Sequence, residues 1–366
     1  ERCGRARCCC GAASGRRPPE RRRAPMWHWV SKWLCPCRAR SKTYVVGCTA
    51  GRESPTGPPA DDAAQRLTVA QRRLTALSGA YDNSLRLWDL RRGSCERALR
   101  GHADTIWCVA AGWGQRRALT GSGDGTLRLW DLDGGECLGA LLDGGEDMLR
   151  CLAADWPSQR ALCGYVDGSL KLWDLERGVC LSRLRGHREP VWCLAVDWGE
   201  HCALSGCGDG SMILWDLQHA SCIETTHVLE DPVWCLAADW GEWRALSGSG
   251  DGLLRLWDLD SFSCIETLRG HEDAVRCVAV SWHLQRALSG ARDQTLRLWD
   301  LGSCSCIGTL RGHEDAVWCL AVDSEFRQAV SGSRDETLKL WDLEQATCVK
   351  TMKGHQGPVM CVAVDF

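Results

Sequence analysis

The stretch "RGHEDAVWCLAVD", residues 311–323, decides the fold because versions of it return along the chain. The close copies are "RGHADTIWCVA" (100–110), "RGHREPVWCLAVD" (185–197), "RGHEDAVRCVAV" (269–280) and "KGHQGPVMCVAVD" (353–365). A histidine and a cysteine in one unit, here His313 and Cys319, suggest either a nucleophile with its base or two metal ligands. A catalytic or metal site is built once in a chain, however, whereas these residues recur in most units. The recurrence therefore favours a structural role for both residues.

A second recurring stretch, such as "LSGSGDGLLRLWDL" (246–259), carries a Trp-Asp pair. The tryptophan of this pair falls at positions 88, 130, 173, 215, 257, 299 and 341, so the repeat is 42 or 43 residues long. Each repeat predicts four short strands with Gly and Asp at the turns between them. The four strand types are exemplified by "AVWCLAV" (316–322), "RALSG" (244–248), "TLRLWDL" (295–301) and "SCIETL" (263–268).

Strands of this length, with Gly-His and Trp-Asp in register, resemble the WD-repeat β-propeller family. The resemblance covers residues 59–366 and implies an all-β, seven-bladed β-propeller of four-stranded antiparallel blades. It implies little about function, because this fold has many unrelated roles. How the ring closes is open: "RLTVA" (66–70) matches an inner strand poorly, whereas "GPVMCVAVDF" (357–366) matches it well. Either this extra C-terminal strand joins the first blade, or the chain is a piece of a longer repeat array.

The resemblance also implies a hydrogen-bonded tetrad in each complete blade. Its members are a His before the inner strand, a Ser or Thr on the second strand, an Asp in the next turn and the Trp of the third strand. Four tetrads have the same spacing: His102, Thr120, Asp124 and Trp130; His187, Ser205, Asp209 and Trp215; His271, Ser289, Asp293 and Trp299; and His313, Ser331, Asp335 and Trp341. Four copies of one Ser/His/Asp arrangement argue for a network that rigidifies each blade, and against a hydrolase triad.

Three units depart from the tetrad pattern. Ala60, Gly145 and Leu229 stand where the His is expected, and Cys163 replaces the hydroxyl residue in one of these units. Because a buried network stabilises a blade only when its members are satisfied, these blades are predicted to be locally less stable.

Charge is divided unevenly along the chain. Residues 1–52 carry 13 Lys/Arg and 2 Asp/Glu, and the remainder carries 31 and 45, so the two parts have net charges of +11 and −14. We expect residues 1–58 to be a disordered basic tail. The acidic remainder excludes nucleic-acid binding through the propeller, because that binding depends on clustered Lys and Arg. No stretch approaches the roughly 20 apolar residues of a membrane span.

Fourteen of the 25 cysteines occupy two fixed positions of the repeat. The inner-strand set is Cys108, Cys151, Cys193, Cys235, Cys277, Cys319 and Cys361, and the outer-strand set is Cys95, Cys137, Cys180, Cys222, Cys264, Cys306 and Cys348. Three inter-strand steps of about 4.8 Å separate the two positions of a blade by roughly 14 Å. A disulfide needs Cα atoms within about 7 Å. We therefore interpret these residues as buried free thiols that pack as small hydrophobic groups, in keeping with a reducing, cytoplasmic location.

The apolar positions of the opening stretch indicate a β-bulge. Val317, Leu320 and Val322 are spaced by three and then two residues, so the bulge is predicted at Trp318–Cys319, where it turns Trp318 toward the rim of the central channel. In the family, partners commonly dock on this face, at the bulge residue and at the residue before the turn Asp. Because Trp, Tyr and Arg dominate interface hot spots, the predicted partner-binding residues are Tyr81, Trp107, Trp192, Trp234, Arg276, Arg292, Trp318 and Arg334.

Those residues are expected to concentrate in one sector of the ring. Arg276, Arg292, Trp318, Arg334 and Tyr81 belong to the last two blades and the first, and we expect them to be neighbours in a basic, aromatic sector. The alternative is that they only line the channel.

A second tryptophan set follows the inner strands, on the opposite face: Trp113, Trp156, Trp198, Trp240 and Trp282. These residues either form a second interface or fold back over the hairpins, and we favour the second interpretation. No close grouping of ligands has the spacing of a zinc site. The Gly-Asp-Gly turns lack the lysine and helix of a phosphate loop. The sequence therefore predicts no metal, no cofactor and no small-molecule substrate.

These observations favour a non-enzymatic scaffold or adaptor that assembles other proteins or peptides, acidic ones in particular. One alternative comes from "MWHWVSKWLCPCRARSK" (26–42), where lipidation of Cys35 or Cys37 would tether a signalling or trafficking subunit to a membrane surface. A substrate adaptor of a ubiquitin ligase is the other alternative. An enzyme would need one blade that gains an acid, a base or a nucleophile, and the sequence points to none.

Overall fold

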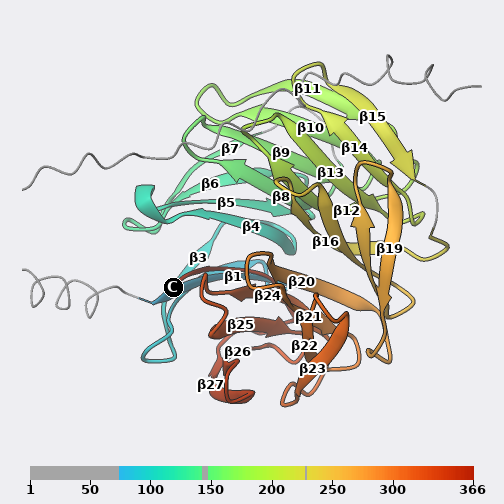
Figure 1. Ribbon diagram of the computed structural model, residues 1–366. Coiled ribbons are helices and arrows are strands. Elements are labelled where there is room, and N and C mark those ends of the chain that lie inside the picture. Colours follow the sequence, from blue (N-terminus) through green and yellow to red (C-terminus); the bar gives the residue numbers. More distant parts are fainter. Residues whose placement is uncertain (1–73, 142–146, 227–228) are drawn as a thin grey trace, which may run out of the picture. The chain divides into compact units, whose positions relative to one another are not determined.

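The computed structural model describes residues 74–141, 147–226 and 229–366. These residues form 28 strands in seven four-stranded antiparallel sheets, together with one 3₁₀ helix, η2 (Trp113–Gln115). The sheets are arranged around a common centre as blades (Figure 1). The prediction of an all-β, seven-bladed propeller is confirmed. The predicted tail, residues 1–58, lies outside the described residues.

Each blade begins with an inner strand and ends with an outer strand. Blades 1 to 3 are β28 (Val359–Asp365), β1 (Thr75–Ala80), β2 (Ser84–Asp89) and β3 (Ser94–Arg100); β4 (Ile106–Gly112), β5 (Arg117–Ser122), β6 (Leu127–Asp131) and β7 (Cys137–Leu141); and β8 (Leu149–Asp155), β9 (Arg160–Tyr165), β10 (Ser169–Asp174) and β11 (Val179–Arg185). Blades 4 and 5 are β12 (Val191–Asp197), β13 (Cys202–Cys207), β14 (Met212–Asp216) and β15 (Ser221–Thr226); and β16 (Val233–Asp239), β17 (Arg244–Ser249), β18 (Leu254–Asp258) and β19 (Ser263–Leu268). Blades 6 and 7 are β20 (Val275–Ser281), β21 (Arg286–Ala291), β22 (Leu296–Asp300) and β23 (Ser305–Leu310); and β24 (Val317–Val322), β25 (Gln328–Ser333), β26 (Thr337–Asp342) and β27 (Thr347–Lys353).

The ring closes through β28. Each inner strand contacts the inner strand of the next blade, and this series returns from β24 through β28 to β4. Strand β28 pairs antiparallel with β1, from Thr75 opposite Asp365 to Ala80 opposite Val359. Of the two alternatives for the stretch 357–366, the structure therefore has the one in which it completes the first blade. The poorer candidate, residues 66–70, lies outside the described residues.

The turns between the second and third strands explain the Gly and Asp of the repeat. Gly125, Gly168, Gly210 and Gly252 follow the turn Asp with φ between +76° and +78°, in the left-handed region where glycine has no steric penalty. Blades 1, 6 and 7 place Asn83, Gln294 and Glu336 at the same position with φ of 61°, 69° and 67°. Asn83 tolerates this conformation, whereas in blades 6 and 7 the turn keeps its geometry against the preference of Gln294 and Glu336.

The hydrophobic core lies between neighbouring blades. One cluster combines Leu288 and Leu298 of blade 6 with Phe326, Ala329 and Trp341 of blade 7, and the other clusters repeat this arrangement around the ring. Burying apolar side chains contributes about 25 cal/mol per Å². Since every blade supplies half of two clusters, a blade is stable only with its neighbours in place.

The two cysteine sets have different environments. All seven inner-strand cysteines are buried, and several donate a thiol hydrogen bond to a carbonyl of the next blade, such as Cys193 Sγ to Val233 O at 3.5 Å. The outer-strand cysteines are exposed or half-buried, as Cys137 and Cys348 illustrate. The prediction of a buried thiol is wrong for this second set, because the outer strand is the edge of the blade and the cysteine position on it is open to solvent on one side.

Candidate functional site

Three of the four predicted tetrads form the complete hydrogen-bonded chain, in blades 2, 6 and 7, and blade 4 has its part from Trp215 through Ser205 to His187. In blade 7, Trp341 Nε1 donates to Ser331 Oγ at 2.7 Å, and His313 Nε2 lies 2.7 Å from the same oxygen. His313 Nδ1 lies 2.7 Å from Asp335 Oδ2. Equivalent chains join the members in blade 2 (His102, Thr120, Asp124, Trp130) and blade 6 (His271, Ser289, Asp293, Trp299).

These networks shift the pKa of the turn carboxylates. Burial alone would raise the pKa of Asp335, but hydrogen bonds from His313, Thr337 and the backbone of Glu314 outweigh burial and lower it. The pKa of Asp124 is lowered to about 2 for the same reason, through Thr126, Ala103 and His102. The carboxylate form is therefore favoured, and each tetrad fastens the loop before the inner strand to the turn after the second strand.

Blade 1 has a complete tetrad that the sequence prediction missed. His355, from the loop before β28, lies 2.7 Å from Ser78 Oγ through Nε2, and Trp88 Nε1 donates to that oxygen at 2.8 Å. Its Nδ1 lies 3.2 Å from Asp82 Oδ2. The expectation that the first unit lacks a histidine, because Ala60 stands there, is wrong. The histidine comes from the far end of the repeat array, 277 positions from Ser78.

Blades 3 and 5 replace parts of the tetrad. In blade 5, Leu229 stands at the histidine position, Trp257 still donates to Ser247 Oγ at 2.8 Å, and Arg255 forms an ion pair with Asp251. In blade 3, Trp173 Nε1 donates to Tyr165 Oη at 3.3 Å. Gly145, at the histidine position of blade 3, lies outside the described residues.

The β-bulge is present in all seven blades. In blade 7 the pairing of β24 with β25 passes from Val317 to Cys319 and omits Trp318. The other inner strands shift register at the equivalent place. We call the seven residues at this position the bulge ring: Trp107, Arg150, Trp192, Trp234, Arg276, Trp318 and Met360.

Six side chains of the bulge ring, from Trp107 to Trp318, contact one another across the blades. The Arg150 guanidinium lies 3.7 Å from the ring centroid of Trp107 and 4.9 Å from that of Trp192. Trp192 and Trp234 have centroids 4.6 Å apart. Cation–π contacts of this kind are worth about 0.5–2 kcal/mol, more when desolvated.

Arg276 continues this series into the next two blades. Its guanidinium lies 3.6 Å from the Trp234 centroid and 4.6 Å from the Trp318 centroid. An unbroken series of contacts therefore runs from Trp107 to Trp318 and places each arginine between two indoles. The basic, aromatic surface covers blades 2 to 7, rather than only the last two blades and the first.

Several donors of the bulge ring have no acceptor among the described residues. These buried atoms are Arg150 Nε and Nη1, Arg276 Nε, Trp234 Nε1 and Trp318 Nε1. Burial lowers the pKa of Arg276 to about 10, with a further contribution from the neighbouring Arg292. Guanidinium and indole groups only donate hydrogen bonds. The ring is therefore a group of hydrogen-bond donors.

The predicted residues before the turn Asp surround the bulge ring. Arg292 lies close enough to Arg276 to affect its pKa, and its backbone N–H donates to Ala274 O at 2.9 Å. Arg334 is exposed and lies 3.7 Å from Asp315 in an ion pair. The Tyr81 side chain is 61% exposed. Arg276, Arg292 and Trp318 are thus brought together, and Arg334 pairs with an acid of its own blade.

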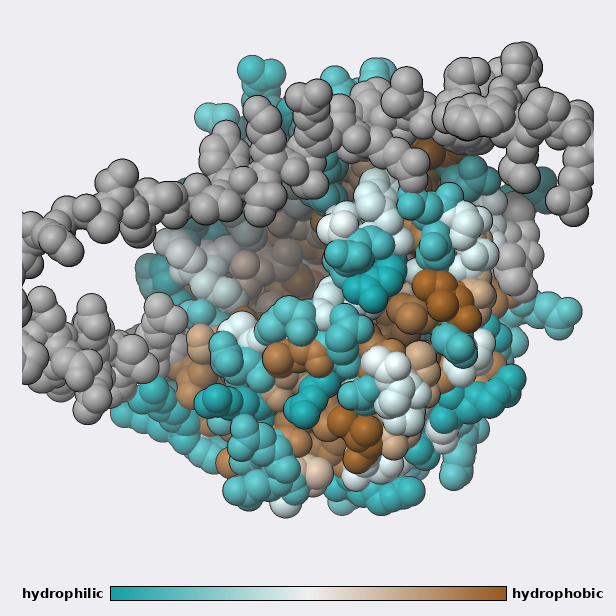
Figure 2. Space-filling model, viewed as in Figure 1, coloured by the Kyte–Doolittle hydropathy of each residue, from teal (hydrophilic) through white to brown (hydrophobic). Residues whose placement is uncertain are grey.

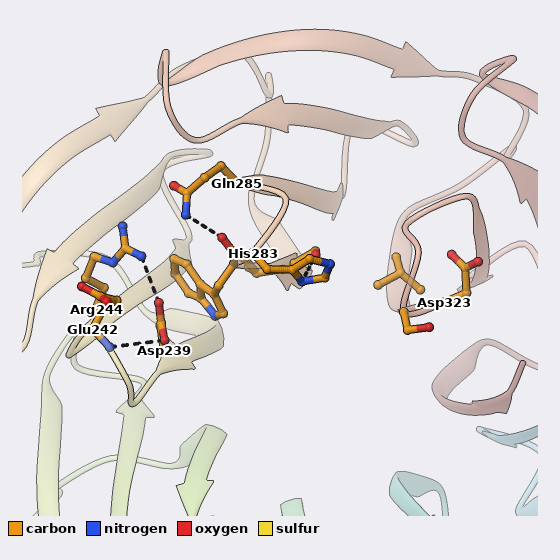
Figure 3. Close-up of a pocket in the computed structure, with 11 residues that line it drawn as sticks. Asp239, Glu242, Arg244, His283, Gln285 and Asp323 are labelled. Atoms are coloured by element: carbon orange, nitrogen blue, oxygen red, sulfur yellow. Dashed lines mark hydrogen bonds and ion pairs between the residues drawn. The ribbon is translucent and has the colours of Figure 1, made fainter. Parts of the chain in front are cut away.

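The second tryptophan set lies at the other ends of the inner strands. Each of Trp113, Trp156, Trp198, Trp240 and Trp282 is partly buried and packs on a core cluster. Trp282 Nε1 donates to Ala238 O of the preceding blade at 3.2 Å, and Arg244, which pairs with Asp239 at 3.0 Å, lies beside it. Figure 3 shows the pocket here, with Arg244 and Asp239 on one side and Asp323 on the other. These contacts agree with indoles that fold back over the hairpins.

The fold and its repeated tetrads define a β-propeller made of Trp-Asp repeats. The family model described as "WD domain, G-beta repeat" matches residues 93–131, 178–216, 220–258, 262–300 and 304–342, which is more than half of the chain. The chain therefore belongs to the WD40 repeat family, whose propellers are commonly protein-interaction scaffolds and generally not enzymes. A comparison with curated proteins finds none that matches this chain. The unit with Cys163 and Tyr165 lies between the matched stretches.

Two features of the remaining sequence bear on the alternatives. The described residues include no helix long and apolar enough to cross a membrane. Cys35 and Cys37, the candidate lipidation sites, lie outside the described residues.

Sequence reasoning missed one group of side chains. His187, Cys207 and Asp209 of blade 4 have ligand atoms within 4.8 Å of one another. A signal was available: Cys207 stands where blades 2, 5 and 7 have Ser122, Ser249 and Ser333.

Proposed function

We propose that this protein is a non-enzymatic, cytoplasmic scaffold that docks acidic segments of partner proteins on the bulge-ring face. The observation that carries the proposal is the pair of arginines held between indoles. Arg150 and Arg276 each contact two tryptophans, and both keep guanidinium N–H groups without an acceptor among the described residues. A carboxylate offers the planar acceptor pair that a guanidinium binds best.

Burial and charge both favour an anionic partner. Burial lowers the pKa of Arg150 and of Arg276, which means that each cation is held in surroundings that solvate it poorly. An incoming carboxylate would restore the lost solvation. The stacked indoles fix the guanidinium planes beforehand, so little side-chain entropy is lost on binding.

The surface in view in Figure 2 is mixed in hydropathy. In Figure 2, apolar residues on the face in view form several separate patches among hydrophilic ones. Continuous apolar patches are what mark a hydrophobic interface. The eighteen cysteines of the described residues are all free, in keeping with the proposed cytoplasmic location.

Binding of a Glu-rich peptide to the full chain tests this proposal. We would measure the dissociation constant by calorimetry for the wild type and for Arg150→Gln/Arg276→Gln. The matched control is Arg177→Gln, which removes a charge from an exposed arginine that pairs with Asp174 in the turn after β10. We expect the double variant to bind at least tenfold more weakly, which is about 1.4 kcal/mol, and the control to bind as the wild type does.

Two results would overturn the proposal. One is equal weakening by the control, which would indicate that only net charge matters. The other is binding of a Lys-rich peptide with the same affinity as the Glu-rich peptide. Partners that co-purify with the wild type and are lost from the double variant would identify the natural ligand.

A further inference from the structure

Blade 4 has Cys207 where blades 2, 5 and 7 have a serine, and this position lies beside the bulge ring. Gly208 lies between Cys207 and Asp209, and it is so close to Trp192 that a Cβ atom added to it would be 3.2 Å from Trp192 Nε1. Cys207 is fully buried, His187 is 8% exposed and Asp209 is half-buried, so the group is enclosed on one side and reachable on the other. Cys207 Sγ donates to Glu189 O at 3.1 Å, which holds the thiol against the loop before β12.

The histidine of blade 4 contacts two hydroxyl groups. His187 Nε2 lies 2.6 Å from Ser205 Oγ, to which Trp215 Nε1 also donates. Its Nδ1 atom lies 2.9 Å from Ser211 Oγ. In blades 2 and 6 the Nδ1 atom lies near both the equivalent hydroxyl and the turn carboxylate.

The carboxylate of blade 4 is placed differently. In blades 1, 2, 6 and 7 the turn Asp accepts from the backbone N–H of the residue after the histidine, as Asp335 does from Glu314 at 3.0 Å. Asp209 accepts from Ser211 N at 2.9 Å, as the other turn aspartates do from the equivalent residue, and it also forms a side-chain hydrogen bond with Cys207. The Cys207 thiol, the Asp209 carboxylate and a ring nitrogen of His187 thus lie within 4.8 Å of one another.

We propose that His187 Nδ1, Cys207 Sγ and Asp209 form a zinc-binding site. Zinc takes nitrogen, sulfur and oxygen ligands at about 2.0–2.3 Å in a tetrahedron, which needs donors about 3.3–3.8 Å apart. The present separations, all within 4.8 Å, require the ligands to approach by about 1 Å. With a metal on Nδ1, Nε2 would carry the proton, and its contact with Ser205 would be the outer-shell hydrogen bond that orients a metal-bound histidine. Three protein ligands leave a fourth position for water.

The same geometry argues against a Cys–His–Asp nucleophile. Burial and the neighbouring Asp209 raise the pKa of Cys207 to about 11, so the thiol is protonated at neutral pH. A divalent cation would displace that proton and be neutralised by the thiolate and the carboxylate. It would also fasten the loop that carries Glu189 and Pro190 to the turn that carries Gly208, directly under Trp192.

Cobalt substitution gives the direct test, on the full chain. We expect the wild type to bind one Co²⁺ with the thiolate charge-transfer band and intense visible bands of a tetrahedral site, and Zn²⁺ to abolish them. Cys207→Ser should lose the charge-transfer band, and Asp209→Asn should weaken Co²⁺ binding at least tenfold. Serine occupies this position in blades 2, 5 and 7, so the Cys207→Ser chain is expected to fold.

Cys202→Ser is the matched control. Cys202 is buried in the same strand, and its thiol donates to Glu200 O at 3.5 Å. This variant should keep the wild-type spectrum, and Zn²⁺ should raise its Tm as it raises that of the wild type. A wild-type chain without the band, or a Cys207→Ser chain that keeps it at full intensity, would overturn the proposal. Loss of the site would leave peptide docking by Arg150 and Arg276 to be judged by its own experiment.

Discussion

Blades 7 and 3 hold the same buried tryptophan with different partners. In blade 7 the Trp341 indole donates to Ser331, which is joined to His313 and then to Asp335. In blade 3 the Trp173 indole donates to Tyr165. Cys163 occupies the position of Ser331, and Lys171 Nζ lies 4.1 Å from the Tyr165 ring centroid. Both indoles are 1% exposed.

The difference shows which part of the tetrad the fold requires. A buried indole N–H needs an acceptor, because an unsatisfied donor costs about 1–3 kcal/mol. Side chains two residues apart on a strand share one face, so Tyr165 can supply the acceptor that position 163 lacks. The histidine and aspartate add a second function, since they connect a loop to a turn. A blade can therefore lose that connection and still pack.

The largest expected effect comes from substitutions at the same second-strand position in blade 7 and in blade 3. Ser331→Ala leaves His313 Nε2 and Trp341 Nε1 without their shared partner, and should lower the free energy of unfolding by about 2–3 kcal/mol. Cys163→Ala removes a small buried group that does not hold the indole of blade 3, and should cost only about 1 kcal/mol. Urea unfolding of both variants measures the difference. Equal losses would mean that the two positions have the same role.

A smaller effect is expected from pH, and it separates blades with a histidine from blade 3. Burial lowers the folded-state pKa of His102 and His355 below 6.5. The unfolded chain therefore binds more protons, and stability falls as pH drops below about 6.5. Asp124, with a pKa of about 2 against 3.8, adds a further loss between roughly pH 4 and pH 2.

The pH prediction is checked by denaturation at pH 7.5 and pH 5. The variant His102→Gln/His355→Gln should lose less stability between these pH values than the wild type does. The described part of blade 3, Leu149–Arg185, contains no histidine, so it has no group of this kind. If the double variant had the same pH dependence as the wild type, His102 and His355 would not be the source of the loss of stability at low pH.

The smallest effect concerns the turns of the same two blades. Blade 3 has Gly168 in the left-handed conformation, whereas blade 7 has Glu336 there at φ 67°. Glu336→Gly should raise the free energy of unfolding by about 0.5 kcal/mol, because relief of a strain of about 1 kcal/mol is partly offset by the greater freedom of glycine in the unfolded chain. Gln345→Gly, at an exposed position with ordinary φ, is the control and should lower it.

The sequence was sufficient to predict the structural features that recur from one repeat to the next. The positions of Val317, Leu320 and Val322 predicted the bulge, and the spacing of His313, Ser331 and Trp341 predicted the network. The stacking of Arg150 was also within reach, because Trp107 and Trp192 stand at the equivalent positions of the flanking repeats. The residues predicted for docking were chosen by type, without using this adjacency around the ring.

The features that the sequence could not predict depend on contacts between distant parts of the chain or on the conformations of single side chains. The pairing of His355 with Ser78 needs the closure of the whole ring. The grouping of His187, Cys207 and Asp209 depends on the side-chain orientations of residues from a loop, a strand end and a turn. Exposure of the outer cysteines depends on the absence of a layer beyond the blade edge.

The pairing of β28 with β1 has a consequence for synthesis on the ribosome. Strands β1 to β3 emerge early, but their inner strand is made about 260 residues later, which takes roughly 13–50 s at 5–20 residues per second. During that interval β1 has an unpaired edge, a state that favours association with other chains. The part of the propeller that is translated first is thus the last to be completed, so this interval is when chaperones would be needed most.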